Sequence, residues 1–91
     1  MDRIAKHVIF RGQVQGVGFR YTTHRIAGRY DITGFVRNLP DGTVEMLAQG
    51  PPDEVDRCLA EVQDSFSGYI REAKIVQVPC HPQYDDFRIT R

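Results

Sequence analysis

Hydrophobic and polar positions alternate with a period of two over residues 7–14, which is the pattern of a β-strand with one buried face. Val8, Phe10 and Val14 share the face that this alternation marks as buried. Further on, the period changes to that of an amphipathic helix, whose apolar stripe is Phe19, Thr23, Ile26, Ala27 and Tyr30. The first third of the chain therefore predicts a strand, a loop and a helix.

Alternation returns at residues 33–38 and again at residues 43–49, and it predicts two more strands. The stretch between them, residues 39–43, contains proline and then aspartate-glycine, which is the chemistry of a tight turn. The two strands should therefore form a hairpin. The second of them directs Val44, Met46 and Ala48 inward and Glu45, Leu47 and Gln49 outward.

A second helix is predicted after Gly50, because two prolines follow and proline is tolerated in a first helical turn. Its buried face consists of Val55, Cys58, Leu59, Val62 and Phe66. Ser67 and Gly68 should end this helix. Residues 73–78 then predict a fourth strand, and residues 87–89 predict a short closing strand.

The predicted order is strand, helix, strand, strand, helix, strand, and it favours an α+β fold of the ferredoxin-like, split βαβ type (βαββαβ). We expect an antiparallel four-stranded sheet with both helices on one face and the first strand in a central position, to which the short closing strand can be added. In this arrangement the first and second strands both pair with the third. The loop after Val14 and the side chain of Asn38 should then lie close together on the side that the helices cover.

Residues 15–18 place two glycines directly before the predicted helix, where successive backbone N–H groups form a ready anion site. Arg20 adds a planar donor that can bind an oxyanion through two hydrogen bonds. The alternative interpretation is an ordinary turn followed by a solvated arginine. Tyr21 stands where a dinucleotide-binding G-x-G-x-x-G motif needs its third glycine, and no Walker-type lysine follows. An anion site formed by this loop and Arg20, here called the cradle, would therefore hold a small phosphate.

Length and composition limit the classes of protein that fit. The 91 residues predict one domain spanning 1–91. Twelve basic and twelve acidic residues give zero net charge, without the broad positive field that supports nonspecific nucleic-acid binding. Because the chain has no apolar run long enough for a signal peptide or a membrane span, we expect a cytoplasmic protein with no membrane partner. Cys58 and Cys80 form no C-x-x-C pair, so free thiols are expected, with a single disulfide as the alternative.

Two motifs, GQVQGVGFR at residues 12–20 and GFVRNLPDGTVE at residues 34–45, closely resemble the acylphosphatases. The resemblance spans almost the whole chain, because the Gly50-Pro51 step, the second helix and the closing strand also fit. The family often has leucine-glycine-leucine at the end of the first helix, where this chain has Tyr30-Asp31-Ile32, and tryptophan where this chain has Phe35. We expect Asp31 to adopt the left-handed conformation there, with a cost to stability.

The resemblance implies the ferredoxin-like fold and the hydrolysis of the carboxyl-phosphate bond of acyl phosphates, with no metal and no cofactor. It implies that Arg20 binds the phosphate and that Asn38 positions the attacking water, so that these two are the catalytic residues. The implied phosphate-binding residues are Gln15, Gly16, Val17, Gly18, Phe19 and Arg20. The implied partners are a small-molecule acyl phosphate and inorganic phosphate, the latter as product and inhibitor, and we expect a monomer.

Three other functions share this order of elements. An RNA-recognition module would carry aromatic residues on its third strand, and residues 43–49 contain none. The acyl-phosphate or carbamoyl-phosphate binding module of hydrogenase-maturation proteins would be joined to zinc-binding cysteine pairs and a long extension. A metal chaperone would need paired cysteines after the first strand, and none occur there. A catalytic acylphosphatase is therefore the function that the sequence predicts.

Overall fold

The computed structural model describes residues 2–91 as one five-stranded sheet with two helices. The elements in chain order are β1 (Ile4–Gly12), α1 (Phe19–Ala27), β2 (Thr33–Asn38), β3 (Val44–Gly50), α2 (Pro52–Ser65), β4 (Ile70–Val78) and β5 (Phe87–Ile89). The strand order across the sheet is β4-β1-β3-β2-β5. The predicted ferredoxin-like fold and its closing strand are confirmed. The sheet is mixed, because β5 pairs with β2 in parallel whereas the other neighbours are antiparallel.

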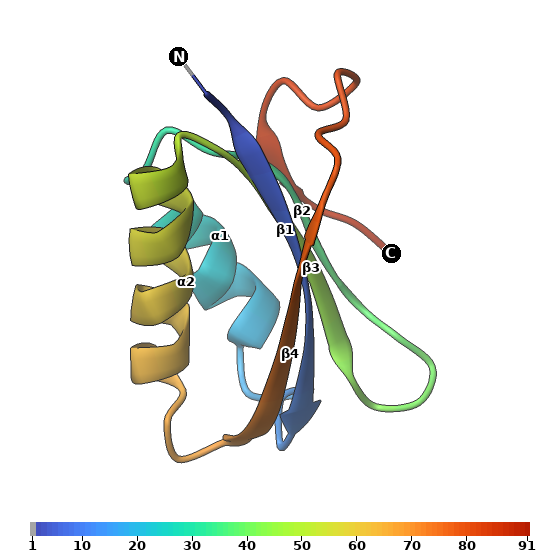
Figure 1. The fold of residues 1–91 in the computed structure, drawn as a ribbon. Coiled ribbons are helices and arrows are strands. Elements are labelled where there is room, and N and C mark those ends of the chain that lie inside the picture. The colour runs from blue at the N-terminus through green and yellow to red at the C-terminus, as the bar shows by residue number, and fades with distance from the viewer. Residues whose placement is uncertain (1) are drawn as a thin grey trace.

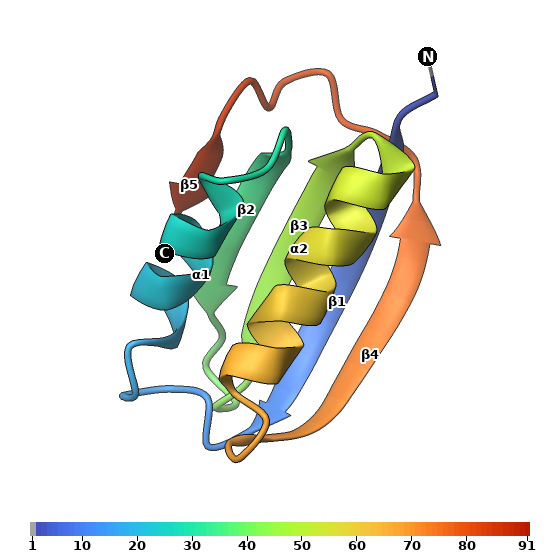
Figure 2. The ribbon, with the colours of Figure 1, turned by 90° about the vertical axis from the view of Figure 1, so that its left-hand side faces the viewer.

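Both helices pack against one face of the sheet (Figure 1), and Figure 2 shows them side by side in front of it. The inward side chains of β1, β2 and β3 meet the apolar stripes of α1 and α2 in a single core. Its fully buried members include Phe10, Phe19, Ile26, Met46 and Val62. Burial of one such side chain contributes roughly 1.5–3 kcal/mol, so the core holds the two helices on the sheet.

The first and fourth strands are longer at one end than the sequence pattern predicts. β1 begins at Ile4 and ends at Gly12, two residues before Val14, and β4 begins at Ile70. The pairing of these two strands decides both limits, since their register shifts between Arg11 and Gly12 and Gly12 then lies opposite Ile70. A side chain at Gly12 would overlap the backbone carbonyl of Tyr69. Close approach of the two backbones thus requires glycine where the chain leaves the sheet.

The expectation that Leu47 and Gln49 face outward is only half right. Both lie on the sheet face away from the helices, but they are only 4% and 3% exposed. The segment between β4 and β5 passes on this side of the sheet (Figure 1). The Gln49 amide donates to the backbone carbonyl of His81 at 2.7 Å and accepts from the His81 N–H at 2.9 Å. One side chain therefore satisfies both the backbone N–H and the backbone carbonyl of His81 in the covering segment.

The expected left-handed conformation at Asp31 is wrong. Within residues 2–91 every residue with positive φ is a glycine. Helix α1 ends at Ala27, and Gly28 continues in the right-handed region with φ −64°. The segment between α1 and β2 is instead bound to α2, because the N–H of Asp31 donates to Glu54 at 2.9 Å and the Tyr30 hydroxyl donates to Glu61 at 2.6 Å. Asp31 therefore carries none of the conformational cost that was expected.

Cys58 and Cys80 are free thiols in the part of the chain that the structure describes, as expected. Cys58 is buried in the core, and this burial raises the pKa of its thiol to about 12. Cys80 is exposed on the segment that covers the sheet. Neither helix among residues 2–91 is long and apolar enough to cross a membrane.

Candidate active site

The loop between β1 and α1 has a shape that two glycines make possible. Gly16 and Gly18 have φ of 78° and 76°, in the left-handed region that residues with side chains rarely adopt. Gly18 is the N-cap of α1, so no side chain caps the helix, and no acidic residue lies in its first turn. The N–H groups of that turn are left for another acceptor, at the positive end of the helix dipole.

Phe19 fixes the start of the helix in the core. Its ring lies 5.0 Å from the ring of Phe10 on β1 and 4.5 Å from the ring of Phe66, which follows α2. These contacts join three elements around one side chain that is 2% exposed. Because Arg20 comes next in the chain, its backbone position is held by the same packing.

Arg20 and Asn38 line one cavity of about 240 Å³ beside this helix start. Its walls come from the loop, the first turn of α1, the end of β2 and β5, and they consist of Val14, Gly16, Gly18, Phe19, Arg20, Tyr21, Asn38 and Ile89. The structure thus brings together the loop, Arg20 and Asn38. Arg20 takes part in none of the ion pairs found among residues 2–91. Its guanidinium therefore has no competing carboxylate there.

The side-chain oxygen of Asn38 is buried and has no hydrogen-bond partner among residues 2–91. A buried acceptor without a partner costs on the order of 1–3 kcal/mol. The side-chain hydroxyls of Thr23 and Thr33 are also buried without a partner. Asn38 differs from these two threonines because it lines the cavity. Its side-chain amide can form a hydrogen bond with a molecule that enters there.

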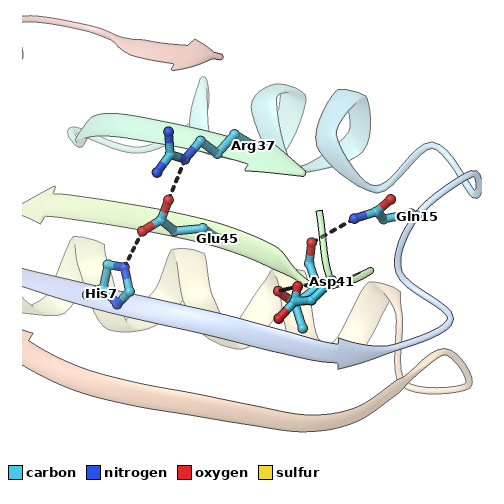
Figure 3. Close-up of polar contacts among 6 residues, drawn as sticks. His7, Gln15, Arg37, Asp41 and Glu45 are labelled. Carbon is cyan, nitrogen blue, oxygen red and sulfur yellow. Dashed lines mark hydrogen bonds and ion pairs between the residues drawn. The ribbon is translucent and has the colours of Figure 1, made fainter. Parts of the chain in front are cut away.

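Gln15 lies in the predicted loop, and its side chain points toward the β2–β3 hairpin (Figure 3). Its amide nitrogen donates to the backbone carbonyls of Leu39 and Thr43, at 2.8 Å each. Both donors of the amide are thereby used, so Gln15 can offer a phosphate only its backbone N–H. The side chain ties the loop to the β2–β3 hairpin instead.

That hairpin has its own internal support. The carboxylate of Asp41 accepts hydrogen bonds from the hydroxyl of Thr43 at 2.6 Å and from its N–H at 3.0 Å. These two bonds lower the pKa of Asp41, because they favour the charged carboxylate. The turn that contains Leu39 and Thr43 is therefore stabilised by its own hydrogen bonds as well as by those from Gln15.

The other predicted phosphate-binding residues divide into two groups. Gly16, Gly18, Phe19 and Arg20 line the cavity, whereas Val17 does not and leaves 36% of its surface exposed.

No three histidine, cysteine, aspartate or glutamate side chains in the described part of the chain lie close enough to hold a metal ion.

Two residues of the cavity wall were missed from the sequence, Tyr21 and Ile89. Tyr21 could have been found, because it follows Arg20 in the first helical turn. Ile89 could not, because only the parallel pairing of β5 with β2 sets it opposite Val36.

The structure is an α+β protein of ferredoxin-like fold in which a helix N-terminus, an arginine and an asparagine line one cavity, and such a cavity suits a small anion. Comparison with known proteins narrows this class. The family model described as Acylphosphatase matches residues 6–89. The acylphosphatase of Pediococcus pentosaceus is 44% identical over 77 residues, which cover 82% of this chain and 86% of that protein. This chain belongs to the acylphosphatase family, and it is a hydrolase that acts on acyl phosphates.

Solved structures agree with this assignment. The crystal structure of acylphosphatase from Bacillus subtilis superposes with a TM-score of 0.86 at 27% identity, over 97% of this chain and 99% of that one. Full-length HypF in its phosphate- and nucleotide-bound form superposes equally well, with a TM-score of 0.86 at 26% identity. That match covers 99% of this chain but only 12% of HypF. The fold therefore occurs both as a separate acylphosphatase and within a much larger protein.

Proposed function

We propose that this hydrolase holds the phosphate of an acyl phosphate with Arg20 and the backbone N–H groups of residues 15–19, while Asn38 orients the attacking water. The observation that carries the proposal is that Asn38, a buried amide whose oxygen has no partner among residues 2–91, lines the same cavity as Arg20. A water molecule that forms a hydrogen bond with the side-chain amide of Asn38 would gain a fixed position beside the phosphate cradle.

The chemistry of the leaving group explains why so few residues suffice. An acyl phosphate releases a carboxylate, whose conjugate acid has a pKa of about 4, so the leaving oxygen needs no proton donor. What remains is to hold the phosphoryl group in line with the water and to stabilise the charge on its oxygens. The helix N-terminus and the guanidinium supply that charge stabilisation.

The proton of the attacking water needs an acceptor. The substrate phosphate itself can take it, because its oxygens lie next to the water in the proposed arrangement. In this scheme the protein supplies neither a side-chain base nor a metal ion. We also propose that inorganic phosphate, which presents the same oxygens, is an inhibitor as well as a product, and that the protein acts as a cytoplasmic monomer.

The test is phosphate release from benzoyl phosphate by the purified protein, with and without a chelator. We expect equal rates in both conditions, and much slower release from an alkyl phosphate monoester, whose alkoxide leaving group needs a proton donor. Loss of activity in chelator that a divalent ion restores would refute the mechanism. Equal turnover of the monoester would refute the role assigned to the leaving group.

A further inference from the structure

The cavity that contains Arg20 has two chemically different parts. One part is formed by the glycine loop, Arg20 and Asn38, and it offers hydrogen-bond donors and an amide. The other part is apolar and includes Tyr21 and Ile89. These two side chains are 71% and 42% exposed, although both carry large apolar surfaces. Single exposed apolar side chains are common on proteins, but here two of them line one cavity next to a polar cradle.

The pairing of β5 places Ile89 on the helix side of the sheet. Ile89 lies opposite Val36, whose side chain is fully buried beneath the helices. Partners in adjacent strands direct their side chains to the same face, so Ile89 also points toward the side that α1 covers. Val36 is two residues before Asn38 on β2, and this spacing brings Ile89 close to the cradle.

The start of α1 brings Tyr21 to the same place. The ring of His24 on α1 lies 6.4 Å from the ring of Phe87 on β5, so this face of the helix is next to that strand. Strands β2 and β5 both run toward the end of the molecule where α1 begins (Figure 2). One turn from His24 toward the helix start is Tyr21, and two residues from Phe87 toward the strand end is Ile89. Both therefore line the cavity on the side where α1 meets β5.

We propose that Tyr21 and Ile89 form the binding surface for the acyl group, and that they make the enzyme prefer acyl phosphates with an aromatic or branched apolar acyl part. The proposal rests on the function proposed above, because the phosphate must occupy the Arg20 cradle for the acyl group to reach these side chains. An acyl group that covers them removes apolar surface from water on both sides of the contact. An acetyl group is too small to cover both.

The experiment compares kcat/KM for benzoyl phosphate with kcat/KM for acetyl phosphate in the wild type, in Tyr21→Ala, in Ile89→Ala and in the double variant. We expect the wild type to prefer benzoyl phosphate, and the double variant to lose on the order of 10-fold of this preference, mainly through a higher KM for benzoyl phosphate. The inhibition constant of inorganic phosphate should not change, because phosphate does not reach the apolar part. Comparing one ratio between variants cancels the intrinsic reactivity of the two substrates.

Two controls separate the acyl contact from other effects. Val76→Ala removes an apolar side chain that is 46% exposed on β4 and outside the cavity, so it should leave the preference unchanged. Tyr21→Phe keeps the ring and should keep the preference. If Ile89→Ala disturbs the short strand β5, Tyr21→Ala alone still tests the proposal, because Tyr21 is on an exposed helical position.

The possible results are distinct. A wild type without preference for benzoyl phosphate would overturn the proposal, and so would a double variant that keeps the full preference. In both cases the hydrolysis of acyl phosphates would stand. A wild type that hydrolyses neither substrate would instead refute the proposed function and this inference with it.

Discussion

Arg20 and Asn38 line the same cavity, but the proposed mechanism gives them different energetic roles. Arg20 contacts the phosphate both before and during the reaction, so Arg20→Ala should weaken phosphate binding and turnover together. Arg20→Lys should recover little, because an ammonium cannot reproduce the two parallel hydrogen bonds of a guanidinium. The matched control is Arg25→Lys, an exposed position on α1 outside the cavity, which should change neither property.

Asn38 is assigned to the water, so Asn38→Ala should lower the turnover of benzoyl phosphate by roughly 100-fold or more. The affinity for inorganic phosphate should stay close to that of the wild type, because the cradle is left intact. Calorimetry with phosphate and steady-state kinetics on the same preparations measure the two properties. Wild-type turnover in Asn38→Ala would show that its side-chain amide does not hold the nucleophile.

At the scale of elements, the loop and the β2–β3 hairpin are joined through the side chain of Gln15. Gln15→Ala removes two hydrogen bonds, each worth about 0.5–1.5 kcal/mol, and frees the loop from the hairpin. We expect a lower midpoint in urea unfolding and a weaker affinity for phosphate, because the loop must then be ordered by the ligand. Unchanged phosphate affinity in a destabilised variant would limit Gln15 to a structural role.

A second link between elements lies on the sheet face away from the helices. Glu45 on β3 lies between His7 on β1, at 2.7 Å, and Arg37 on β2, at 2.5 Å (Figure 3). Burial alone would raise the pKa of Glu45, but the hydrogen bonds from these two side chains outweigh it and lower the pKa below the ordinary value of 4.5. One carboxylate thus connects the three neighbouring strands β1, β3 and β2.

This link makes part of the stability depend on pH. The pKa of Glu45 is lower in the folded chain than in the unfolded chain, so its contribution is complete above pH 4.5 and is lost as the pH falls through the folded-state pKa. Urea unfolding of the wild type and of Glu45→Gln between pH 7 and pH ~3 measures this contribution. The difference in stability between the two proteins should shrink on acidification. A constant difference would mean that the ion pairs do not stabilise the fold.

At the scale of the whole molecule, phosphate should stabilise the folded chain, since the cradle is assembled from parts that only the fold brings together. At a phosphate concentration 100 times the dissociation constant, the free energy of unfolding should rise by about 2.7 kcal/mol. For a domain of this size that corresponds to a rise in Tm of roughly 11–22 °C. Chloride at equal ionic strength is the control, and Arg20→Ala should lose the shift. An unchanged Tm in phosphate would count against the cradle.

The sequence by itself determined the order of the elements and the composition of the core. The alternation around Val8 and Phe10, and the stripe that includes Phe19 and Ile26, are local patterns, and each is set by how an individual strand or helix places its side chains. The two family motifs also pointed to Arg20 and Asn38, which the structure places in one cavity. The roles of these two residues stay predictions until the variants are measured.

Only the tertiary structure decided which residues meet across the chain. In the folded chain Leu47 is buried beneath the segment between β4 and β5, and the side chain of Gln15 binds the hairpin. Ile89 lies in the wall of the same cavity as Arg20. The tertiary structure also extended β4 to Ile70, because that strand continues as long as β1 offers it partners. The physical reason is the same in each case: these contacts join residues far apart in the sequence. Strand register and packing between elements create them, and no local period of hydrophobic and polar positions encodes either.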